Sequence, residues 1–437
     1  RVDKMKMRAE QKTAVKNSIG RLVFVALSVL LQVIWICVQA MKLNRYSTWI
    51  SVATSVLTLV VVILLYGRRT NAAFKMPWII LILAFPVLGL GMYLLFGRKE
   101  ATRLVRERFE RIDQSLDGLL IQDKAVRIKL QQTDRMAANE AAYIWNYAKY
   151  PIYQNTDVVF YKEASEGIEA QKQALNQAKQ FIFMEYHAIE DKQSFGELKE
   201  ILARKAKEGV EVRLFYDDIG SIGFINTDFI QRMEAEGIQC RVFNRLMPVL
   251  NVFMNNRDHR KITVIDGKIG FTGGYNLADE YFNITHPYGY WKDTGVRLEG
   301  DAVRSMTVMF LEMWNAIKYT DTDYTPYFPQ DGAQPHEAGL AGSAAGRGVG
   351  ADANIAADSA SGFVQPYADS PLDGEPVGEN VYMGVVKAAS EYVYFTTPYL
   401  IISDEMSREL CLAAKRGVDV RIVTPGIPDK KLVYRVT

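Results

Sequence analysis

Three long apolar runs near the start of the chain are the clearest feature of its hydrophobic pattern. They cover residues 22–40, 48–66 and 77–96, and none contains a charged side chain. Each run has roughly the 20 residues that an α-helix needs to cross the hydrocarbon core of a bilayer. We therefore expect three transmembrane helices within residues 1–97, in a multi-pass protein of the cell membrane. The alternative is a set of core helices in a soluble domain.

The charges around these runs bear on orientation. Lys and Arg crowd the segments before the first run and after the third, and the positive-inside bias places both flanks in the cytoplasm. Three crossings cannot put both flanks on one side, so either the N-terminus lies outside or one run does not cross. Pro86, Gly89 and Gly91 make the third run the candidate for a re-entrant hairpin. We expect a cytoplasmic catalytic part whose basic juxtamembrane stretch faces anionic lipids.

After a charged, helix-prone juxtamembrane linker at residues 98–150, the pattern changes to alternating strands and helices. A buried strand at 180–189, a helical stretch and a second strand at 210–218 form one β-α-β unit. The same order recurs downstream, where AKRGVDVRIV repeats AKEGVEVRLF with Gly417 aligned to Gly209. The soluble part is therefore expected to be a membrane-anchored α/β protein with duplicated α/β/α halves.

This repeat divides the soluble part into two halves of unequal length. The first half is expected at residues 151–330 and the second at 363–437, joined by a flexible Gly/Ala-rich loop at 331–362. The offset between the halves carries a second copy of the segment around His259 past Thr437. We therefore expect the second half to be truncated in this chain.

Composition narrows the function classes. The formal net charge is +2, which gives no sign of a nucleic-acid partner. The three cysteines, Cys37, Cys240 and Cys411, are scattered and form no CxxC pair. We expect reduced structural thiols and no metal site.

The densest cluster of reactive residues lies in NNRDHRKITVIDGKIGFTGGYN, which ends at Asn276. Its RKITVID part is strand-like, so His259 and Lys261, two positions apart, are expected on the same face. Asp266 lies at an Asp-Gly hairpin turn and would face away from His259 on an unbroken strand, which favours a turn or supporting role. Asp293, in YWKDTGVRLEG, is a rival candidate for orienting the imidazole of His259.

A histidine beside a lysine suits a phosphoester substrate. Lysine neutralises a non-bridging oxygen, while neutral imidazole attacks phosphorus or gives a proton to the leaving group. Asn276 and the backbone N–H groups of Gly273 and Gly274 are candidate donors where negative charge builds up. A surface histidine in a charged hairpin is the plain structural alternative.

Other polar residues near the predicted strands are weaker candidates. Glu185, in MEYHAI, is a candidate to contact a substrate hydroxyl. His187, in the same stretch, either lines the cleft or packs, and packing is favoured. His286 and His336 are interpreted as incidental. The apolar loop at 244–256, just before the motif, is either a core helix or a lip that admits acyl chains.

The arrangement His259-x-Lys261-x4-Asp266-x6-Gly273-Gly274-x-Asn276 resembles the HKD motif of the phospholipase D superfamily, in its Gly-Gly form. The stretches YWKDTGVRLEG, VQPYADSPLD and RGVDVRIVTPGIPDKK are similar to bacterial cardiolipin synthases of this type, and so is MPWIILILAFPVLGLGMYLLFG in the apolar region. The likeness runs from about residue 55 to the end, apart from the Gly/Ala-rich loop. The first apolar run looks like an addition to the usual two.

The resemblance implies a reaction that joins two phosphatidylglycerols into cardiolipin and free glycerol, without a metal or nucleotide cofactor. His259 would become the phosphatidyl-histidine, Lys261 would bind phosphate and Asp266 would support the motif. In that family two such motifs meet at the interface of two halves, whereas this sequence contains one. We therefore expect this chain to be inactive unless two chains pair their motifs in a homodimer.

Other activities share the motif. A phospholipase D-type phospholipid hydrolase or another phosphatidyltransferase is the nearest alternative, because acceptor choice depends on the shape of the cleft. A membrane-anchored nuclease or phosphodiesterase would favour a basic groove with stacking aromatics. A catalytically inactive scaffold is the remaining class. The expected partners are phosphatidylglycerol and anionic membrane lipids, with no nucleic acid.

Overall fold

The computed structural model describes most of the chain, and three predicted features lie largely outside the described residues. These are the first apolar run, the Gly/Ala-rich loop and the apolar loop before the His259 motif. The described residues are single positions between 27 and 41 together with 48–68, 72–96, 103–116, 118–245, 257–328, 362–369 and 375–435.

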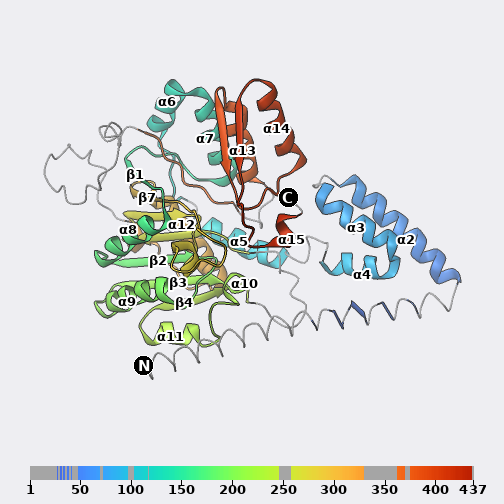
Figure 1. Ribbon diagram of the computed structural model, residues 1–437, viewed down its shortest axis with the longest axis horizontal. Helices are drawn as coiled ribbons and strands as arrows, with labels where there is room; N and C mark the ends of the chain where they lie inside the picture. The colour runs from blue at the N-terminus through green and yellow to red at the C-terminus, as the bar shows by residue number, and fades with distance from the viewer. Residues whose placement is uncertain are drawn as a thin grey trace.

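A group of three apolar helices precedes the α/β part (Figure 1). The helices are α2 (Thr48–Gly67), α3 (Ala72–Ala84) and α4 (Pro86–Phe96). Their small buried core is made by Leu65, Ile82, Leu90 and Tyr93. Within the described ranges, no helix combines the length and the apolar character that crossing a bilayer requires. The predicted transmembrane helices therefore stay a prediction.

The third apolar run does not form one continuous helix, because it is divided between α3 and α4. Pro86 restricts the preceding residue to non-helical geometry, and α3 ends at Ala84. A side chain at Gly89 would lie 2.6 Å from the Cα of Ile82, so a glycine is needed where the two helices approach. The run forms a helical hairpin, the arrangement that Pro86 and Gly89 had indicated.

Three helices occupy the predicted linker, and they connect the two parts of the α/β region. They are α5 (Arg103–Leu116), α6 (Lys124–Thr133) and α7 (Arg135–Ala148). The carboxylate of Asp134 accepts hydrogen bonds from the first backbone N–H groups of α7, which fixes where that helix begins. Helix α5 packs on α12 (Val303–Ile317), while α7 packs on α13 (Val377–Ala388).

A seven-stranded mixed sheet lies at the centre of the first half. Its strands in spatial order are β1 (Thr156–Tyr161), β7 (Gly295–Gly300), β6 (Ile269–Gly273), β5 (Lys261–Ile265), β2 (Phe181–Tyr186), β3 (Glu211–Asp217) and β4 (Gln239–Phe243). The pairs β2–β3 and β3–β4 are parallel, and all other neighbours are antiparallel. Strand β5, which carries the motif, therefore lies in the middle of the sheet.

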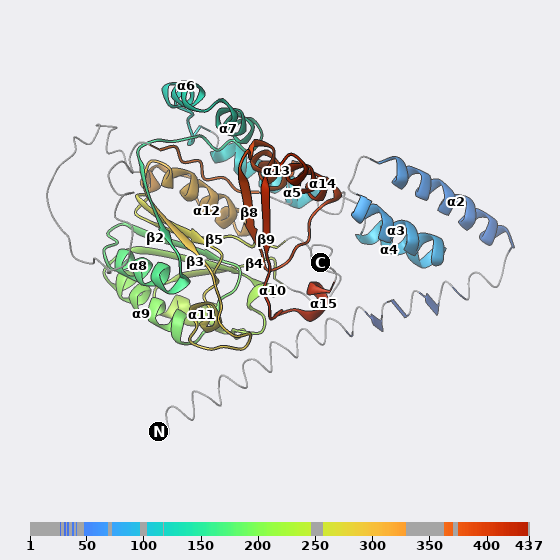
Figure 2. The same ribbon diagram turned by 45° about the horizontal axis from the view of Figure 1, so that its top comes forward.

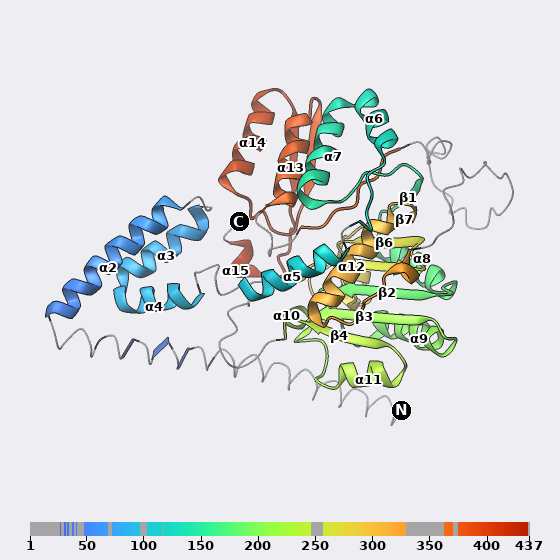
Figure 3. The same ribbon diagram turned by 180° about the vertical axis from the view of Figure 1, so that it is seen from behind.

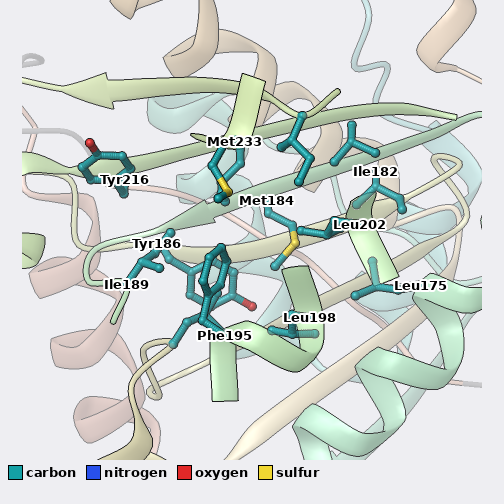
Figure 4. Close-up of a cluster of buried hydrophobic side chains, with 14 of the residues drawn as sticks. Leu175, Ile182, Met184, Tyr186, Ile189, Phe195, Leu198, Leu202, Tyr216 and Met233 are labelled. Atoms are coloured by element: carbon teal, nitrogen blue, oxygen red, sulfur yellow. The ribbon is translucent and has the colours of Figure 1, made fainter. Parts of the chain in front are cut away.

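Helices cover both faces of this sheet. Helices α8 (Ala164–Asn176), α9 (Gln193–Lys207) and α11 (Phe229–Ala235) pack on one face, and α5 and α12 lie across the other (Figure 3). Because side chains alternate along a strand, Ile182 and Met184 point into the first layer (Figure 4). Phe181 and Phe183 point into the second, where Phe183 stacks on Phe310 at 4.5 Å between ring centroids. The β2 sequence is therefore apolar almost throughout, as burial on both faces requires.

The second α/β unit repeats the beginning of the first. It contains α13, β8 (Tyr392–Thr396), α14 (Asp404–Lys415), β9 (Asp419–Val423) and the short helix α15 (Lys431–Tyr434), with β8 and β9 parallel. Gly209 and Gly417 both have positive φ, at +91° and +96°. The residue after each glycine donates its N–H to the carbonyl five residues back in the preceding helix. The aligned glycines thus end the two helices by the same hydrogen-bond pattern.

Candidate active site

His259 and Lys261 lie together at the start of β5. The Nζ of Lys261 lies 3.2 Å from Nδ1 of His259 and donates a hydrogen bond to the His259 carbonyl at 2.6 Å. Lys261 is buried, whereas the side chain of His259 is exposed. The strand alternation expected from the sequence therefore places an ammonium beneath an accessible imidazole.

The surroundings favour the uncharged form of the imidazole. Partial burial, together with the charges of Lys261, His187 and Lys430, lowers the pKa of His259 to about 4. Burial also lowers the pKa of Lys261 to about 8, although Asp258, Asp293 and Glu185 oppose that shift. Near neutral pH the site therefore holds a neutral imidazole beside a largely protonated lysine, the pair that phosphoester chemistry needs.

His187, for which the sequence left packing and cleft lining open, packs against the imidazole of His259. Its ring centroid lies 4.6 Å from that of His259, and its Nδ1 lies 2.6 Å from the carbonyl oxygen of Asp258. Gly220 makes room for it, since a side chain there would lie 2.7 Å from the His187 Nε2. Strand β2 pairs with β5, and this pairing brings His187 beside His259. The hydrophobic pattern of one strand does not reveal which strand is its neighbour.

Asp217 holds the backbone that leads into His259, and no sequence pattern had singled it out. Its Oδ2 accepts a hydrogen bond from the N–H of Asp258 at 3.1 Å. Its Oδ1 accepts from Ile219 and Gly220 at the start of α10 (Asp218–Ser221), at 2.9 and 3.1 Å. This fully buried carboxylate at the end of β3 therefore fixes the turn from which the imidazole projects.

Glu185 does not have the substrate contact that was predicted for it. Its side chain is fully buried on the α12 side of the sheet, and its Oε1 accepts a hydrogen bond from Nε of Arg260 at 2.6 Å. Arg260 also donates to the carbonyl of Met309 in α12. Burial raises the pKa of Glu185 well above its usual range. The sheet thus separates Glu185 from the face that carries His259.

Asp266 lies at the opposite end of β5 from His259, so it does not contact the imidazole directly. Its two carboxylate oxygens accept hydrogen bonds from the backbone N–H groups of Lys179, Gln180 and Phe181, at 2.8 to 2.9 Å. Its φ of +51° belongs to the Asp-Gly turn between β5 and β6. Asp266 therefore anchors the start of β2 to the motif strand, which is the supporting role that its position on the strand favoured.

The two glycines of the motif allow close packing, and Gly274 is not a substrate donor. The N–H of Gly274 donates to the carbonyl of Thr294 at 3.2 Å. The donor that was expected to bind a substrate oxygen is therefore already occupied by the backbone. A side chain at Gly274 would lie 2.2 Å from Oδ1 of Asp293, and one at Gly273 would lie 2.6 Å from the Thr294 carbonyl. The Gly-Gly pair therefore lets the segment before β7 lie directly against β6.

Asn276 and Asp293 hold the protein around the pair. The side-chain oxygen of Asn276 accepts from the N–H of Ala188 at 3.1 Å, and its nitrogen donates to the hydroxyl of Tyr281 at 2.8 Å. These contacts fix two loops, and the predicted contact of Asn276 with substrate stays a prediction. Asp293 accepts from the N–H of Thr294 at 2.8 Å, and its charge supports the protonated form of Lys261.

In the described part of the chain, Asp293 makes no hydrogen bond to His259, so its predicted role in orienting the imidazole is not supported. The described ranges also contain no group of three or more His, Cys, Asp or Glu side chains arranged to hold a metal ion. Cys37, Cys240 and Cys411 are free thiols, and Cys240 is buried.

The chain is similar to known proteins over most of its length. Residues 172–314 match the family described as "Cardiolipin synthase, PLD-like domain", and residues 54–98 match "Phospholipase_D-nuclease N-terminal". An uncharacterized protein of Streptococcus mutans is 38% identical over 374 residues, 85% of this chain and 76% of the relative. A cardiolipin synthase of Halalkalibacterium halodurans is 30% identical over 405 residues, 89% of this chain and 74% of the relative. The solved phosphatidylserine synthase of Haemophilus influenzae is 12% identical, with a TM-score of 0.42 over 65% of each chain.

Proposed function

This chain belongs to the cardiolipin synthase family with a phospholipase D-like α/β fold and is a phosphatidyltransferase, and from that premise we propose that it joins two phosphatidylglycerols into cardiolipin and free glycerol. The observation that carries the proposal is the neutral, exposed imidazole of His259 beside the buried ammonium of Lys261. A neutral imidazole is nucleophilic, and a cation at this distance offsets charge on a phosphate oxygen.

The proposed reaction has two steps on the same phosphorus. In the tautomer that holds its proton on Nδ1, His259 has a free lone pair on Nε2, while the ammonium of Lys261 donates to the His259 carbonyl. Nε2 attacks the donor phosphorus, and the bond from phosphorus to the headgroup oxygen breaks. Glycerol leaves after that oxygen takes up a proton, and the phosphatidyl group stays on the imidazole. A headgroup hydroxyl of the acceptor lipid then attacks phosphorus, loses its proton and displaces the imidazole. Cardiolipin forms and His259 is restored.

The proton transfers require a general acid and base, and the family resemblance gives that role to the histidine of a second motif. We propose that residues 151–330 form one phospholipase D-like half and that residues 363–437 begin the other. The local repeat around Gly209 and Gly417 supports this division. The proposed mechanism therefore includes a second motif histidine in that role.

Membrane attachment belongs to the same proposal. Helices α2 and α3 leave a large set of apolar side chains exposed: Val52, Val56, Leu57, Leu59, Val60, Ile63, Leu64, Met76, Ile80 and Leu83. A continuous apolar surface of this kind is costly in water and favourable in lipid. We propose that it holds the catalytic part at the cytoplasmic face of the cell membrane, where its substrates lie.

The test is conversion of phosphatidylglycerol by the protein in mixed vesicles. His259→Asn should reduce cardiolipin formation by roughly four orders of magnitude, because the nucleophile is removed. His286→Asn, in an exposed loop, is the matched control and should leave the rate unchanged. With lipid labelled in its phosphatidyl part, only protein with His259 should carry an acid-labile label. Full cardiolipin formation by His259→Asn would contradict the mechanism, and phosphatidic acid as the sole product would favour the hydrolase.

A further inference from the structure

The loop after β9 brings a second cation to the catalytic half. Helix α15 lies beside α10 in the three views, although it belongs to the second unit (Figures 1 to 3). A side chain at Gly289 in the first half would lie 3.4 Å from Cδ1 of Ile427, so the loop touches the first half. The carboxylate of Asp429 accepts a hydrogen bond from the hydroxyl of Tyr399 at 2.6 Å, which fixes the loop to its own unit.

Lys430 follows Asp429 and lies where this loop reaches the site. Its Nζ lies 5.6 Å from the ring centroid of Tyr399, and the side chain is exposed. Within the described ranges, no carboxylate lies within 4.0 Å of this ammonium. The charge of Lys430 is the smallest of the causes that lower the pKa of His259, and at Glu280, whose pKa burial raises, it acts against that rise. The loop that carries Lys430 therefore lies against the half that contains His259.

The proposed reaction needs a second cation for a chemical reason. An acceptor phosphatidylglycerol carries its own anionic phosphate one glycerol unit away from the attacking hydroxyl. Two phosphates must therefore come close together, and their repulsion is strong where water is partly excluded. Lys261, which lies 3.2 Å from Nδ1 of His259, is placed for the phosphate under attack. Water and simple alcohols carry no phosphate, so a second cation favours the lipid acceptor over them.

We propose that Lys430 binds the phosphate of the acceptor phosphatidylglycerol and thereby selects a lipid instead of water or a small alcohol as acceptor. This inference rests on the proposed function, since it assigns a specificity residue to that reaction. It predicts that Lys430 affects the partition of the phosphatidyl group between acceptors and leaves the attack on the donor largely unchanged.

The experiment measures that partition directly. The protein is given phosphatidylglycerol vesicles together with ethanol, and cardiolipin and phosphatidylethanol are quantified beside released glycerol. Both products arise from the same phosphatidyl-enzyme, so their ratio reports acceptor choice alone. Lys430→Gln should lower the cardiolipin to phosphatidylethanol ratio about tenfold, as expected for the loss of one charge-assisted contact. Glycerol release should change by less than about twofold.

Two variants serve as controls, and thermal unfolding checks that each protein folds. Lys430→Arg keeps the charge and should retain the wild-type ratio. Lys415→Gln removes an exposed charge from α14 of the same unit and should leave both ratio and rate unchanged. An unchanged ratio in Lys430→Gln, or an equal loss of both products, overturns the inference while the proposed function stands. Absence of glycerol release by the unaltered protein would instead count against the proposed function.

Discussion

At the scale of single residues, the site depends on how burial changes two basic groups. The pKa of a lysine in water lies well above neutral pH, but burial lowers the pKa of Lys261. The carboxylates of Asp258 and Asp293 partly restore it, so its pKa is about 8. His259 has no such carboxylate among the causes that act on it, and burial and the charge of Lys261 both disfavour its protonation. Its pKa of about 4 leaves it neutral where the lysine is charged.

These values predict the pH dependence of phosphatidyl transfer. The proposed mechanism requires neutral His259 and protonated Lys261, so kcat/KM should be highest between about pH 5 and 7. It should fall below about pH 4 as His259 gains a proton, and above about pH 8 as Lys261 loses one. In Lys261→Arg the alkaline decline should disappear, because guanidinium stays charged. An alkaline limb that is the same in the variant would show that another group titrates.

Asp266 gives a residue-scale prediction about stability instead of chemistry. Asp266→Asn keeps a residue that tolerates positive φ but removes the charge that three backbone N–H groups bind. We expect it to lower the free energy of unfolding by about 1–3 kcal/mol, and Asp266→Ala by more, because alanine also disfavours the turn. Denaturant unfolding measures this, and the folded protein should keep its specific activity. A folded Asp266→Asn protein without activity would place Asp266 in the chemistry.

At the scale of elements, the hairpin of β5 and β6 carries the motif, and the residues of the motif lie in different environments along that hairpin. The strand begins at Lys261 beside His259 and ends at the turn made by Asp266. Strand β6 then returns to Gly273, where the Gly-Gly pair meets the segment that carries Asp293. The hairpin thus carries Lys261 next to His259. It packs against the segment with Asp293, the carboxylate that favours the protonated form of that lysine.

Gly274→Ala tests this packing. The added methyl group would lie 2.2 Å from Oδ1 of Asp293 and must displace that carboxylate from its place near Lys261. We expect a loss of stability of about 1–3 kcal/mol, as for other overpacked sites, together with reduced phosphatidyl transfer. Gly196→Ala in α9 is the control, since nothing lies within 4 Å of an added methyl group there. It should leave activity unchanged and raise stability by about 0.5–1 kcal/mol. Equal stability of both variants would contradict the close packing.

At the scale of the whole molecule, the apolar helices and the α/β part differ in how far they bury their apolar side chains. The α/β part buries its large apolar side chains in two layers around the sheet. Helices α2, α3 and α4 have a small common core and expose most of α2. A lipid surface would cover these side chains, and the catalytic strand would then lie on a protein held at the bilayer.

Charge placed on α2 should weaken that attachment. Leu59→Glu with Ile63→Glu replaces two side chains that are 59% and 60% exposed, so the fold loses little packing. Flotation with phosphatidylglycerol vesicles should fall by more than about tenfold, because a charged side chain costs about 2.5–3.5 kcal/mol in the apolar core. Ile128→Glu changes a similarly exposed isoleucine on α6 and should not alter flotation. Unchanged flotation of the α2 variant would argue against lipid contact there.

The sequence by itself determined what depends on local backbone geometry. Strand alternation placed His259 and Lys261 on one face, the Asp-Gly pair produced the hairpin, and Gly209 and Gly417 ended equivalent helices. Pro86 and Gly89 likewise indicated the break in the third apolar run. Each of these features is decided within a few residues, so a single sequence contains the information.

Only the tertiary structure decided which distant residues meet. His187 lies against His259 because β2 pairs with β5, and Asp217 holds the same turn from the end of β3. Glu185 is directed away from the site by the sheet, and the loop that carries Lys430 touches the first half from another α/β unit. These contacts depend on strand order and register, which arise from the packing of the whole core and leave no short pattern in the chain.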